Sequence, residues 1–174
     1  MINKLYECIS TVYSTYDEYN SLIEKCDDIN WVNSDYKTSL LHTAISHEKW
    51  EIAKDLINRG INVNMQDVNG NTVLHYIAAK PINIEIAEMI LKNGGNPNLE
   101  NKWSITALFS IVSSPFNDND HYRNNKYLLM ELMIEYGGDE NYRGKKGMTP
   151  LELAYDFEDT KAIEILRKGK KQNE

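Results

Sequence analysis

Cysteine, proline and long hydrophobic runs are all scarce in this chain of 174 residues. Cys8 and Cys26 are its only cysteines, so a framework of several disulfides is excluded, and we expect two small free thiols in helices. No apolar run approaches the ~18 residues of a membrane-spanning helix, and the N-terminus lacks the hydrophobic core of a signal peptide. We therefore expect a cytoplasmic protein that does not contact membranes, or one exported by a route that leaves no such mark.

Basic residues are outnumbered by acidic ones, and 19 Lys and Arg against 26 Asp and Glu give a formal net charge of −7. Direct binding of nucleic acid needs a dense basic surface, so the composition argues against it. The acidic residues are spread along the chain rather than gathered in a tail. They are either solvated helix surface or a complement to a basic partner protein, and the sequence leaves both interpretations open.

A short phrase recurs four times along the chain. It opens with Ser or Thr and continues with apolar residues, at Ser39–Ala44, Thr72–Ala78, Thr106–Ile111 and Thr149–Ala154. The leading residues are separated by 33, 34 and 43 positions. A period near 33 is typical of stacked repeat proteins, and the leading hydroxyl group is suited to capping the N-terminus of a helix.

An independent pattern follows each phrase, namely an apolar helical stripe that ends at a glycine. The stripes are Trp50, Ile52, Ala53, Leu56 and Ile57; Ile84, Ile86, Ala87, Ile90 and Leu91; Leu128, Leu129, Leu132 and Met133; and Ala162, Ile163, Ile165 and Leu166. Their i, i+3, i+4 spacing indicates one buried helical face. The glycines that follow, Gly60, Gly94, Gly137 and Gly169, supply a helix stop.

The recurring phrase resembles the opening of the ankyrin repeat, Thr-Pro-Leu-His-x-Ala, and the resemblance covers nearly the whole chain. It implies a single-domain, all-α solenoid of stacked helix-turn-helix repeats with β-hairpin-like fingers. We expect a degenerate capping repeat at 1–33, repeats at 34–66, 67–100 and 101–143, and a C-terminal repeat at 144–174. In ankyrin proteins the histidine of the phrase ties neighbouring loops together. His42 and His75 match it but Phe109 and Glu152 do not, so this network should be incomplete in the second half.

Departures from the repeat occur in the fingers and in one insertion. The second finger has Asp and Gly at two positions of its turn. The first finger has Ser34 and Lys37 at these positions and the third has Asn101 and Ser104, so these two fingers should be less regular. The interval of 43 contains a polar insertion at about 113–125, between the two helices of the third repeat. It predicts an exposed loop on the edge opposite the fingers, either functional or a tolerated length variant.

The sequence contains few groups that could converge on a catalytic or metal site. His42 and His75 occupy equivalent positions in adjacent repeats, and helices packed ~8–10 Å apart hold them too far apart to share a zinc ion. His47 and His121 have no Cys or His at ligand spacing, and there is no Gly-Lys-Ser/Thr phosphate loop. We therefore expect no enzymatic activity, no cofactor and no metal.

Some side chains on the fingers and inner helices have no packing role in the repeat, and ankyrin proteins bind partners through this concave face. The predicted partner-binding residues are Asp35, Tyr36, Val68, Asn69, Tyr76, Lys102, Trp103, Ile105, Lys145 and Met148. Trp103 is the leading anchor, supported by Tyr36 and Tyr76, because aromatic residues are enriched in interface hot spots. Asp35 is a candidate contact to a basic partner, and Asp67 is a weaker one because its position usually supports the turn.

These features indicate a non-enzymatic module that binds a partner protein and is monomeric when free. Small size and acidity suit a dedicated inhibitor, such as a bacterial immunity protein held against a cognate toxin. A host-directed bacterial effector or viral host-range protein, and a cytoplasmic adaptor, fit the same features. Self-association through the concave face is the structural alternative.

Overall fold

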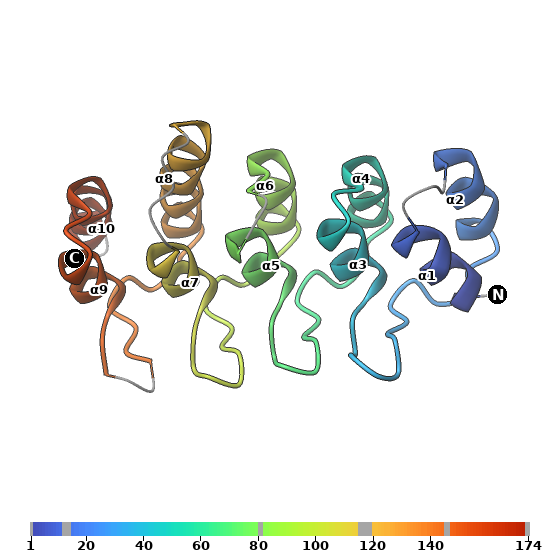
Figure 1. Cartoon of the computed structure of the whole chain (residues 1–174), viewed down its shortest axis with the longest axis horizontal. Helices are drawn as coiled ribbons and strands as arrows, with labels where there is room; N and C mark the ends of the chain where they lie inside the picture. The colour runs from blue at the N-terminus through green and yellow to red at the C-terminus, as the bar shows by residue number, and fades with distance from the viewer. Residues whose placement is uncertain (1, 12–14, 80–81, 115–119, 145–146, 173–174) are drawn as a thin grey trace.

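The computed structural model describes residues 2–11, 15–79, 82–114, 120–144 and 147–172. In these ranges the chain is helical, with no strand beyond one isolated antiparallel bridge between Val32 and Ser39. The helices stand in pairs along a row, with the two termini at opposite ends (Figure 1). They are α1 (Ile2–Ser10), α2 (Tyr16–Ile23), α3 (Leu40–Ser46), α4 (Trp50–Asn58), α5 (Val73–Ala79), α6 (Ile84–Lys92), α7 (Ala107–Ser113), α8 (Asp120–Glu135), α9 (Pro150–Asp156) and α10 (Thr160–Gln172). This is the all-α repeat architecture expected from the sequence.

Polar side chains define where several helices begin. Ser39, Thr106 and Thr149 have extended backbones, and each accepts a hydrogen bond from the backbone N–H three residues later. Thr15 and Asn83 do the same for α2 and α6. Each bond satisfies one of the N–H groups that the first turn of a helix leaves without an internal partner. The residue that leads the repeated phrase therefore sets the start of the helix.

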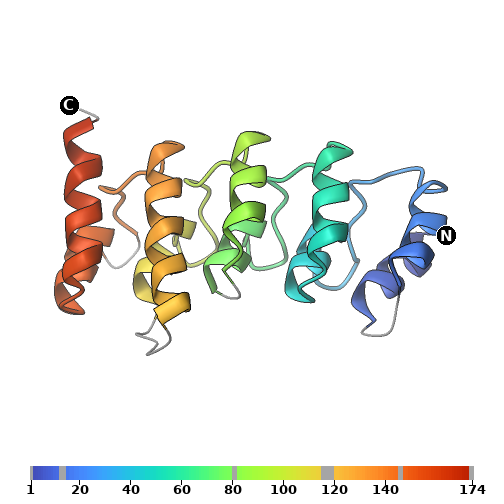
Figure 2. The same ribbon diagram turned by 90° about the horizontal axis from the view of Figure 1, so that it is seen from above.

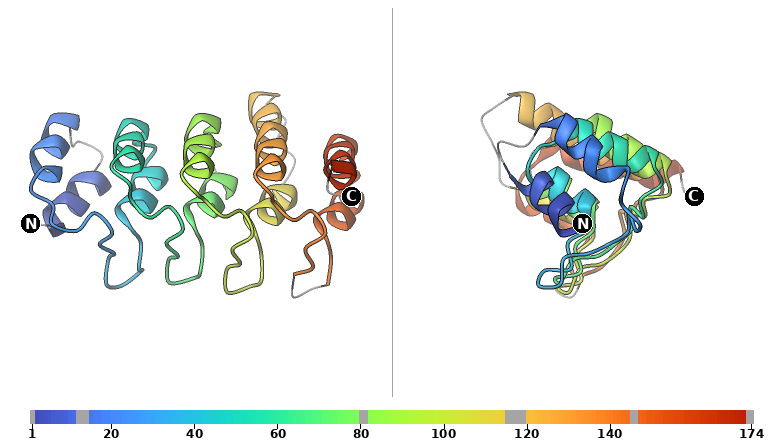
Figure 3. Two further views of the ribbon diagram at one scale, coloured as in Figure 1. Left: turned by 180° about the vertical axis from the view of Figure 1, so that it is seen from behind. Right: turned by 90° about the vertical axis from the view of Figure 1, so that its right-hand side faces the viewer.

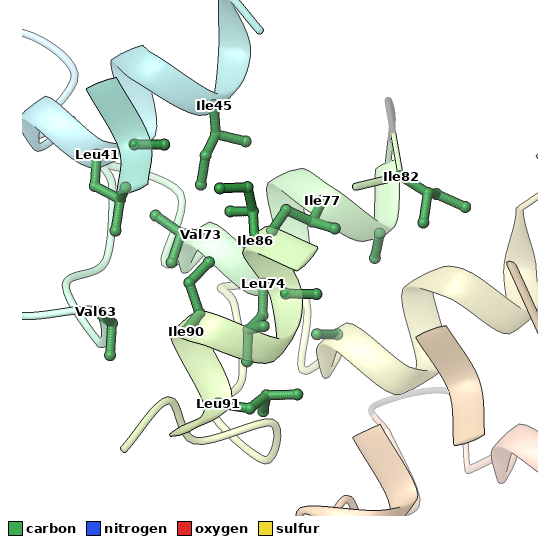
Figure 4. Close-up of a cluster of buried hydrophobic side chains, with 14 of the residues drawn as sticks. Leu41, Ile45, Val63, Val73, Leu74, Ile77, Ile82, Ile86, Ile90 and Leu91 are labelled. Carbon is green, nitrogen blue, oxygen red and sulfur yellow. The ribbon is translucent and has the colours of Figure 1, made fainter. Parts of the chain in front are cut away.

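The helices are arranged in two rows. The inner row consists of α1, α3, α5, α7 and α9, each in contact with the next, and the outer row of α2, α4, α6, α8 and α10 runs beside it (Figure 2). Around α5 and α6, Leu74, Ile77, Ile86 and Ile90 are buried close to Ile45 of the preceding repeat (Figure 4). Helices this short are marginal in isolation, so the stability of each pair depends on burial against its neighbours.

The N-terminal segment forms a helix pair despite its weak match to the repeat. Tyr19 of α2 is fully buried, and its hydroxyl donates to the Asp55 carboxylate at 2.6 Å. Trp31 packs edge-on against Tyr6 of α1, with ring centroids 5.6 Å apart. Both cysteines of the chain are free thiols.

The turns that join successive repeats project to one side of the helices and superpose when the stack is viewed along its length (Figure 3). We call them finger 1 (33–38), finger 2 (67–71), finger 3 (101–105) and finger 4 (143–148), of which residues 145–146 lie outside the described ranges. Gly70 and Gly147 have φ values of 79° and 75° in these turns, and Lys37 and Ser104 adopt the same left-handed region at 53° and 54°. The exchange of Gly for Lys or Ser thus keeps the turn conformation at some cost in backbone strain.

Asparagine side chains connect the loops behind the fingers. The Asn64 amide donates to the Gly94 carbonyl at 2.8 Å, and its oxygen accepts from the Asn96 N–H at 2.8 Å. Asn98 makes the same pair of bonds to the next loop, at 2.7 and 2.8 Å. Each side chain spans one repeat, so these bonds fix the spacing between neighbours.

Much of the predicted insertion loop is helical. Ser113 ends α7, and residues 120–125 belong to α8, which has 16 residues where α4 and α6 have nine; residues 115–119 lie outside the described ranges. The prediction of an exposed loop over 113–125 is wrong for these residues, because lengthening a helix that is already packed costs little free energy. The extension projects on the side away from the fingers, as expected (Figure 1).

The buried face of α8 also differs from the prediction at one position. Leu128 is 48% exposed, whereas Leu129, Met130 and Met133 are fully buried. Successive residues are rotated by about 100° around a helix, so Leu128 falls outside the face that packs on α6 and α10. The apolar pattern was misassigned because Met130 and Leu128 are equally apolar in the sequence.

A buried ion pair joins the third and fourth repeats. The Lys126 ammonium lies 3.1 Å from the Asp159 carboxylate, and the two side chains are 5% and 3% exposed. Asp159 also accepts hydrogen bonds from the Tyr127 hydroxyl at 2.9 Å and from the Ala162 N–H, in the first turn of α10, at 3.0 Å. Lys126 additionally donates to two backbone carbonyls at and just after the end of α7. One carboxylate therefore fixes α8 and α10 together.

We predict that Lys126→Met lowers the free energy of unfolding by about 3 kcal/mol, because it leaves the Asp159 carboxylate buried without its counter-ion. Adding Asp159→Asn should recover most of this loss, since an amide oxygen still accepts from Ala162. Urea unfolding followed by circular dichroism measures both variants. Lys161→Met, which removes an exposed pair with Glu164, is the matched control and should leave the midpoint almost unchanged. Equal losses in the single and double variants would contradict the ion-pair interpretation.

Candidate functional site

The turn of finger 2 is built around the carboxylate of Asp67. Its Oδ1 accepts from the N–H groups of Asn69 and Asn71, both at 2.8 Å, and its Oδ2 accepts from the Tyr76 hydroxyl at 3.0 Å. Asp67 is 8% exposed. Both of its oxygens are engaged inside the molecule, so Asp67 supports the turn and offers no free charge to a partner.

Asparagine takes the place of Asp67 in two other fingers. Asn101 Oδ1 accepts from two backbone N–H groups of finger 3, at 3.0 and 3.2 Å, so this finger has the bonding pattern of finger 2 and is not less regular. In finger 1 the acceptor is Asn33, which accepts from two N–H groups, both at 2.9 Å. Ser34, the residue expected at this position, lies one residue after the true acceptor, because finger 1 contains one more residue than finger 2.

Neighbouring fingers are joined through their backbones. The Val68 N–H donates to the Tyr36 carbonyl at 2.7 Å, and the Lys102 N–H donates to the Asn69 carbonyl at 2.9 Å. The side chains of Tyr36, Asn69 and Lys102 are exposed. Fingers 1 to 3 therefore form one connected surface, and the side chains that point outward from it are not needed to hold it together.

His42 and His75 tie inner helices to the following finger. The Nε2 atom of His42 lies 3.1 Å from the Asn71 carbonyl, and that of His75 lies 2.9 Å from the Ile105 carbonyl. In each ring Nδ1 accepts from the backbone N–H of the residue that precedes the helix, at 3.3 and 3.1 Å. The proton is therefore on Nε2, which donates to the carbonyl. This is the loop-tying role that the ankyrin resemblance implied.

These histidines are neutral at neutral pH. Burial lowers the pKa of His42 to about 4, against the smaller opposing effects of the Asn71 carbonyl and Asp67, and burial also lowers the pKa of His75. Tyr76 lies edge-on to His42 with ring centroids 4.9 Å apart. Burial, and then the charge of Asp67, raise the pKa of Tyr76. Tyr76 is thus partly buried, and both its hydroxyl and its ring make local contacts.

Phe109 and Glu152 stand at the histidine position of the third and fourth repeats. Glu152 keeps the capping part of the role, because it accepts from the Thr149 N–H at 2.8 Å, and it pairs with Arg143 at 2.8 and 3.0 Å. The Thr149 N–H and then Arg143 hold the pKa of Glu152 below its ordinary value. The Phe109 ring can neither accept from the helix cap nor donate to finger 4, so the network is incomplete in this half, as expected.

Finger 4 rests directly on the backbone of finger 3. A Cβ atom on Gly144 would lie 2.6 Å from the Ser104 carbonyl oxygen, so only glycine permits this approach. The Tyr142 hydroxyl donates to the same carbonyl at 3.2 Å. Gly144 also stands where fingers 2 and 3 carry their Asp or Asn acceptor, so finger 4 lacks that side chain.

An apolar groove lies between fingers 3 and 4, where the histidine tie is missing. Trp103 and Ile105 come from finger 3, Met148 from finger 4, Phe109 from α7 and Leu153 from α9. The groove has a volume of about 490 Å³, within the ~300–1,000 Å³ typical of binding sites. Trp103 is 55% exposed. The groove therefore offers apolar surface that the fold leaves uncovered.

The predicted site residues divide by their exposure. Asp35, Tyr36, Asn69, Lys102 and Trp103 are exposed; Val68, Tyr76, Ile105 and Met148 are partly buried; Lys145 lies outside the described residues. The groove brings Trp103, Ile105 and Met148 together, whereas the residues of finger 1 stand two fingers away. Phe109 and Leu153 also line the groove and were not among the predicted residues. Phe109 carried a usable signal, because it departs from the histidine of the phrase.

The part of the chain that the structure describes contains neither a metal site nor a membrane span. No group of three or more His, Cys, Asp or Glu side chains is arranged there to hold a metal ion. Within the same ranges, no helix has both the length and the apolar character needed to cross a bilayer.

We predict that acid weakens the fold through His42. Its folded pKa of about 4 lies below the ~6.5 of an unfolded histidine, so between these values the unfolded chain binds a proton that the folded chain does not. The free energy of unfolding should therefore fall as pH falls from 6.5 to 4, by up to about 1.4 kcal/mol per pH unit for this group. Urea midpoints across this range measure the slope. His42→Gln, which does not titrate, should show a shallower slope; an unchanged slope would contradict the prediction.

Comparison with known proteins agrees with the geometry. The family described as ankyrin repeats, in three copies, matches residues 9–101, just over half of the chain. No curated protein matches the chain significantly. The matched region contains α2 to α6, fingers 1 and 2, and both His42 and His75, and the same architecture of paired helices continues beyond it through α10. The chain belongs to the ankyrin repeat family.

Proposed function

We propose that this protein is a non-enzymatic binding module whose partner protein lies along the fingers and inner helices, anchored in the groove between fingers 3 and 4. Ankyrin repeats indicate a protein–protein interaction module. The observation that carries the finer proposal is the groove, which gathers Trp103, Ile105 and Met148 around an uncovered apolar surface. Large aromatic side chains in such positions commonly provide most of the affinity of an interface.

The exposure of the finger side chains supports the same surface. Tyr36 and Trp103 are 64% and 55% exposed, so neither ring is part of the buried core. The turns beneath them are fixed by Asn33 and Asn101 and by bonds between fingers. A rigid scaffold that presents aromatic side chains loses little conformational entropy on binding. This arrangement suits a preformed binding face.

Inhibition is the biological role we favour for such a module. A dedicated inhibitor, such as a bacterial immunity protein that occupies a toxin, needs a rigid preformed face and no chemistry of its own. A host-directed effector or viral host-range protein would use the same face on a host protein. A self-associating adaptor would use it on a second copy, and light scattering at several concentrations would then show a rising mass.

We predict that a photo-crosslinker placed at position 103 captures the natural partner in extracts of the native cell. Benzoylphenylalanine would replace Trp103 in one variant and Glu85 in a matched control; Glu85 lies on the outer row and its side chain is 63% exposed. Mass spectrometry should identify a cross-linked protein at position 103 and not at position 85. Capture at position 85 alone would place the partner on the outer helices and refute the proposal.

We further predict that Trp103→Ala weakens binding of that partner by about 2 kcal/mol or more, roughly a 30-fold loss. The melting temperature should barely change, because more than half of the side chain is already in water. Calorimetric titration and thermal unfolding measure the two effects. A large loss of stability with unchanged affinity would instead make Trp103 a packing residue.

A further inference from the structure

The backbone carbonyl group at the end of a finger has two hydrogen-bond donors in fingers 2 and 3. The Asn71 carbonyl of finger 2 accepts from an N–H group of its own turn at 2.9 Å, and from the Nε2 atom of His42 at 3.1 Å. The Ile105 carbonyl of finger 3 accepts from its own turn at 3.0 Å, and from the Nε2 atom of His75 at 2.9 Å. One donor therefore comes from the turn and the other from the preceding inner helix.

Met148 holds the same position in finger 4, directly before the helix cap Thr149. Phe109 replaces the histidine of the preceding inner helix, and its ring carries no hydrogen-bond donor. The N–H group of Gly144, at the start of the turn, does not bond to the Met148 carbonyl either. Within the described residues, the Met148 carbonyl therefore lacks both of the donors that its counterparts have.

The direction of the Met148 carbonyl follows from the peptide group that it shares with Thr149. In a planar trans peptide the C=O and N–H bonds point in opposite directions. The Thr149 N–H donates to Glu152 of its own helix, α9, at 2.8 Å, and the corresponding N–H in finger 2 also bonds to its own helix. The Met148 carbonyl therefore points away from α9 and towards α7, where Phe109 lies, as the finger 2 carbonyl points towards the inner helix before it.

This acceptor lies at the groove between fingers 3 and 4. Met148 and Phe109 both line the groove, together with Trp103, Ile105 and Leu153. A partner that fills the groove takes the carbonyl out of water, and a buried acceptor without a donor costs free energy comparable to a lost hydrogen bond. The groove therefore discriminates against a purely apolar side chain and favours one that brings a donor.

We propose that the groove accepts a tryptophan side chain of the partner protein, whose indole N–H donates to the Met148 carbonyl in place of the missing histidine. This proposal rests on the proposed function and names the chemistry of the contact. The indole ring packs against Trp103, Phe109 and the Met148 side chain, and aromatic rings and thioethers both make favourable contacts with an aromatic ring. An indole is a donor without an acceptor, so it brings no additional lone pair into an apolar groove, as a tyrosine hydroxyl would.

Indole and N-methylindole test the proposal with the full-length chain. The two probes have nearly the same shape, but N-methylindole lacks the N–H donor and has more apolar surface. A groove that offered only apolar contact would bind N-methylindole at least as tightly as indole. We expect indole to bind at least fivefold tighter. The affinities are measured by nuclear magnetic resonance titration of isotope-labelled protein, from the shifts of the Ile105 and Met148 amide signals.

Two substitutions of Phe109 identify the acceptor. Phe109→His places a ring donor where His42 and His75 have theirs, so it should occupy the Met148 carbonyl from within and abolish the preference for indole. Phe109→Leu is the matched control, because it alters the same ring without supplying a donor and should keep the preference. Circular dichroism shows whether both variants fold. Trp103→Ala should weaken binding of both probes at least fivefold, which places them in the groove.

Four outcomes overturn the inference. Equal or tighter binding of N-methylindole, or no binding of either probe, would show that the groove does not select a donor. A preference for indole that persists in Phe109→His would show that the Met148 carbonyl is not the acceptor. Unchanged binding in Trp103→Ala would place the probes elsewhere, and a cross-linked partner segment without tryptophan would show that the natural side chain is another one.

The failure of this inference and the failure of the proposed function are distinguishable. Each of the four outcomes leaves the proposed function intact if the cross-linker at position 103 still captures the natural partner. Capture only at position 85 refutes the proposed function itself.

Discussion

Every helix pair in this protein depends on the pair beside it, because a single pair has no second layer on which to bury its apolar residues. Leu74 and Ile90 of the third pair become core residues only when the neighbouring pairs are stacked against them. Because neighbouring pairs must stack closely, the polar side chains that link them recur at equivalent positions in successive repeats. Asn64 and Asn98 set the distance between loops, and His42 and His75 set the distance between an inner helix and the next finger.

The junction between the third and fourth repeats is held by different groups. Phe109 removes the histidine tie there, and the contact of Gly144 with the Ser104 carbonyl and the buried Lys126–Asp159 pair connect the same two repeats. Three features that depart from the other repeats lie together at this junction, namely the groove, the lengthened α8 and the buried ion pair. At the other junctions, polar side chains link neighbouring repeats. At the junction of the third and fourth repeats, apolar surface remains exposed.

The sequence predicted features that repeat and failed where the chain is irregular. The period of 33 and the caps led by Ser39 and Thr149 define the helices, because local hydrogen bonding determines where they start. Leu128 was misplaced because an apolar run does not reveal which residue faces the core. The groove was only half predicted: Trp103 was recognisable as a side chain without a packing role, but its proximity to Leu153 depends on how two repeats meet.

The two buried histidines, His42 and His75, make the two halves of the stack differ in their response to acid. Both lie in the first half, and protonation of Nδ1 would remove the acceptor for the N–H groups of Ser39 and Thr72. Among the described residues that line the junction at Phe109, no histidine ties an inner helix to the next finger. The pH dependence that these two histidines contribute therefore acts on the first half of the stack, away from the groove between fingers 3 and 4.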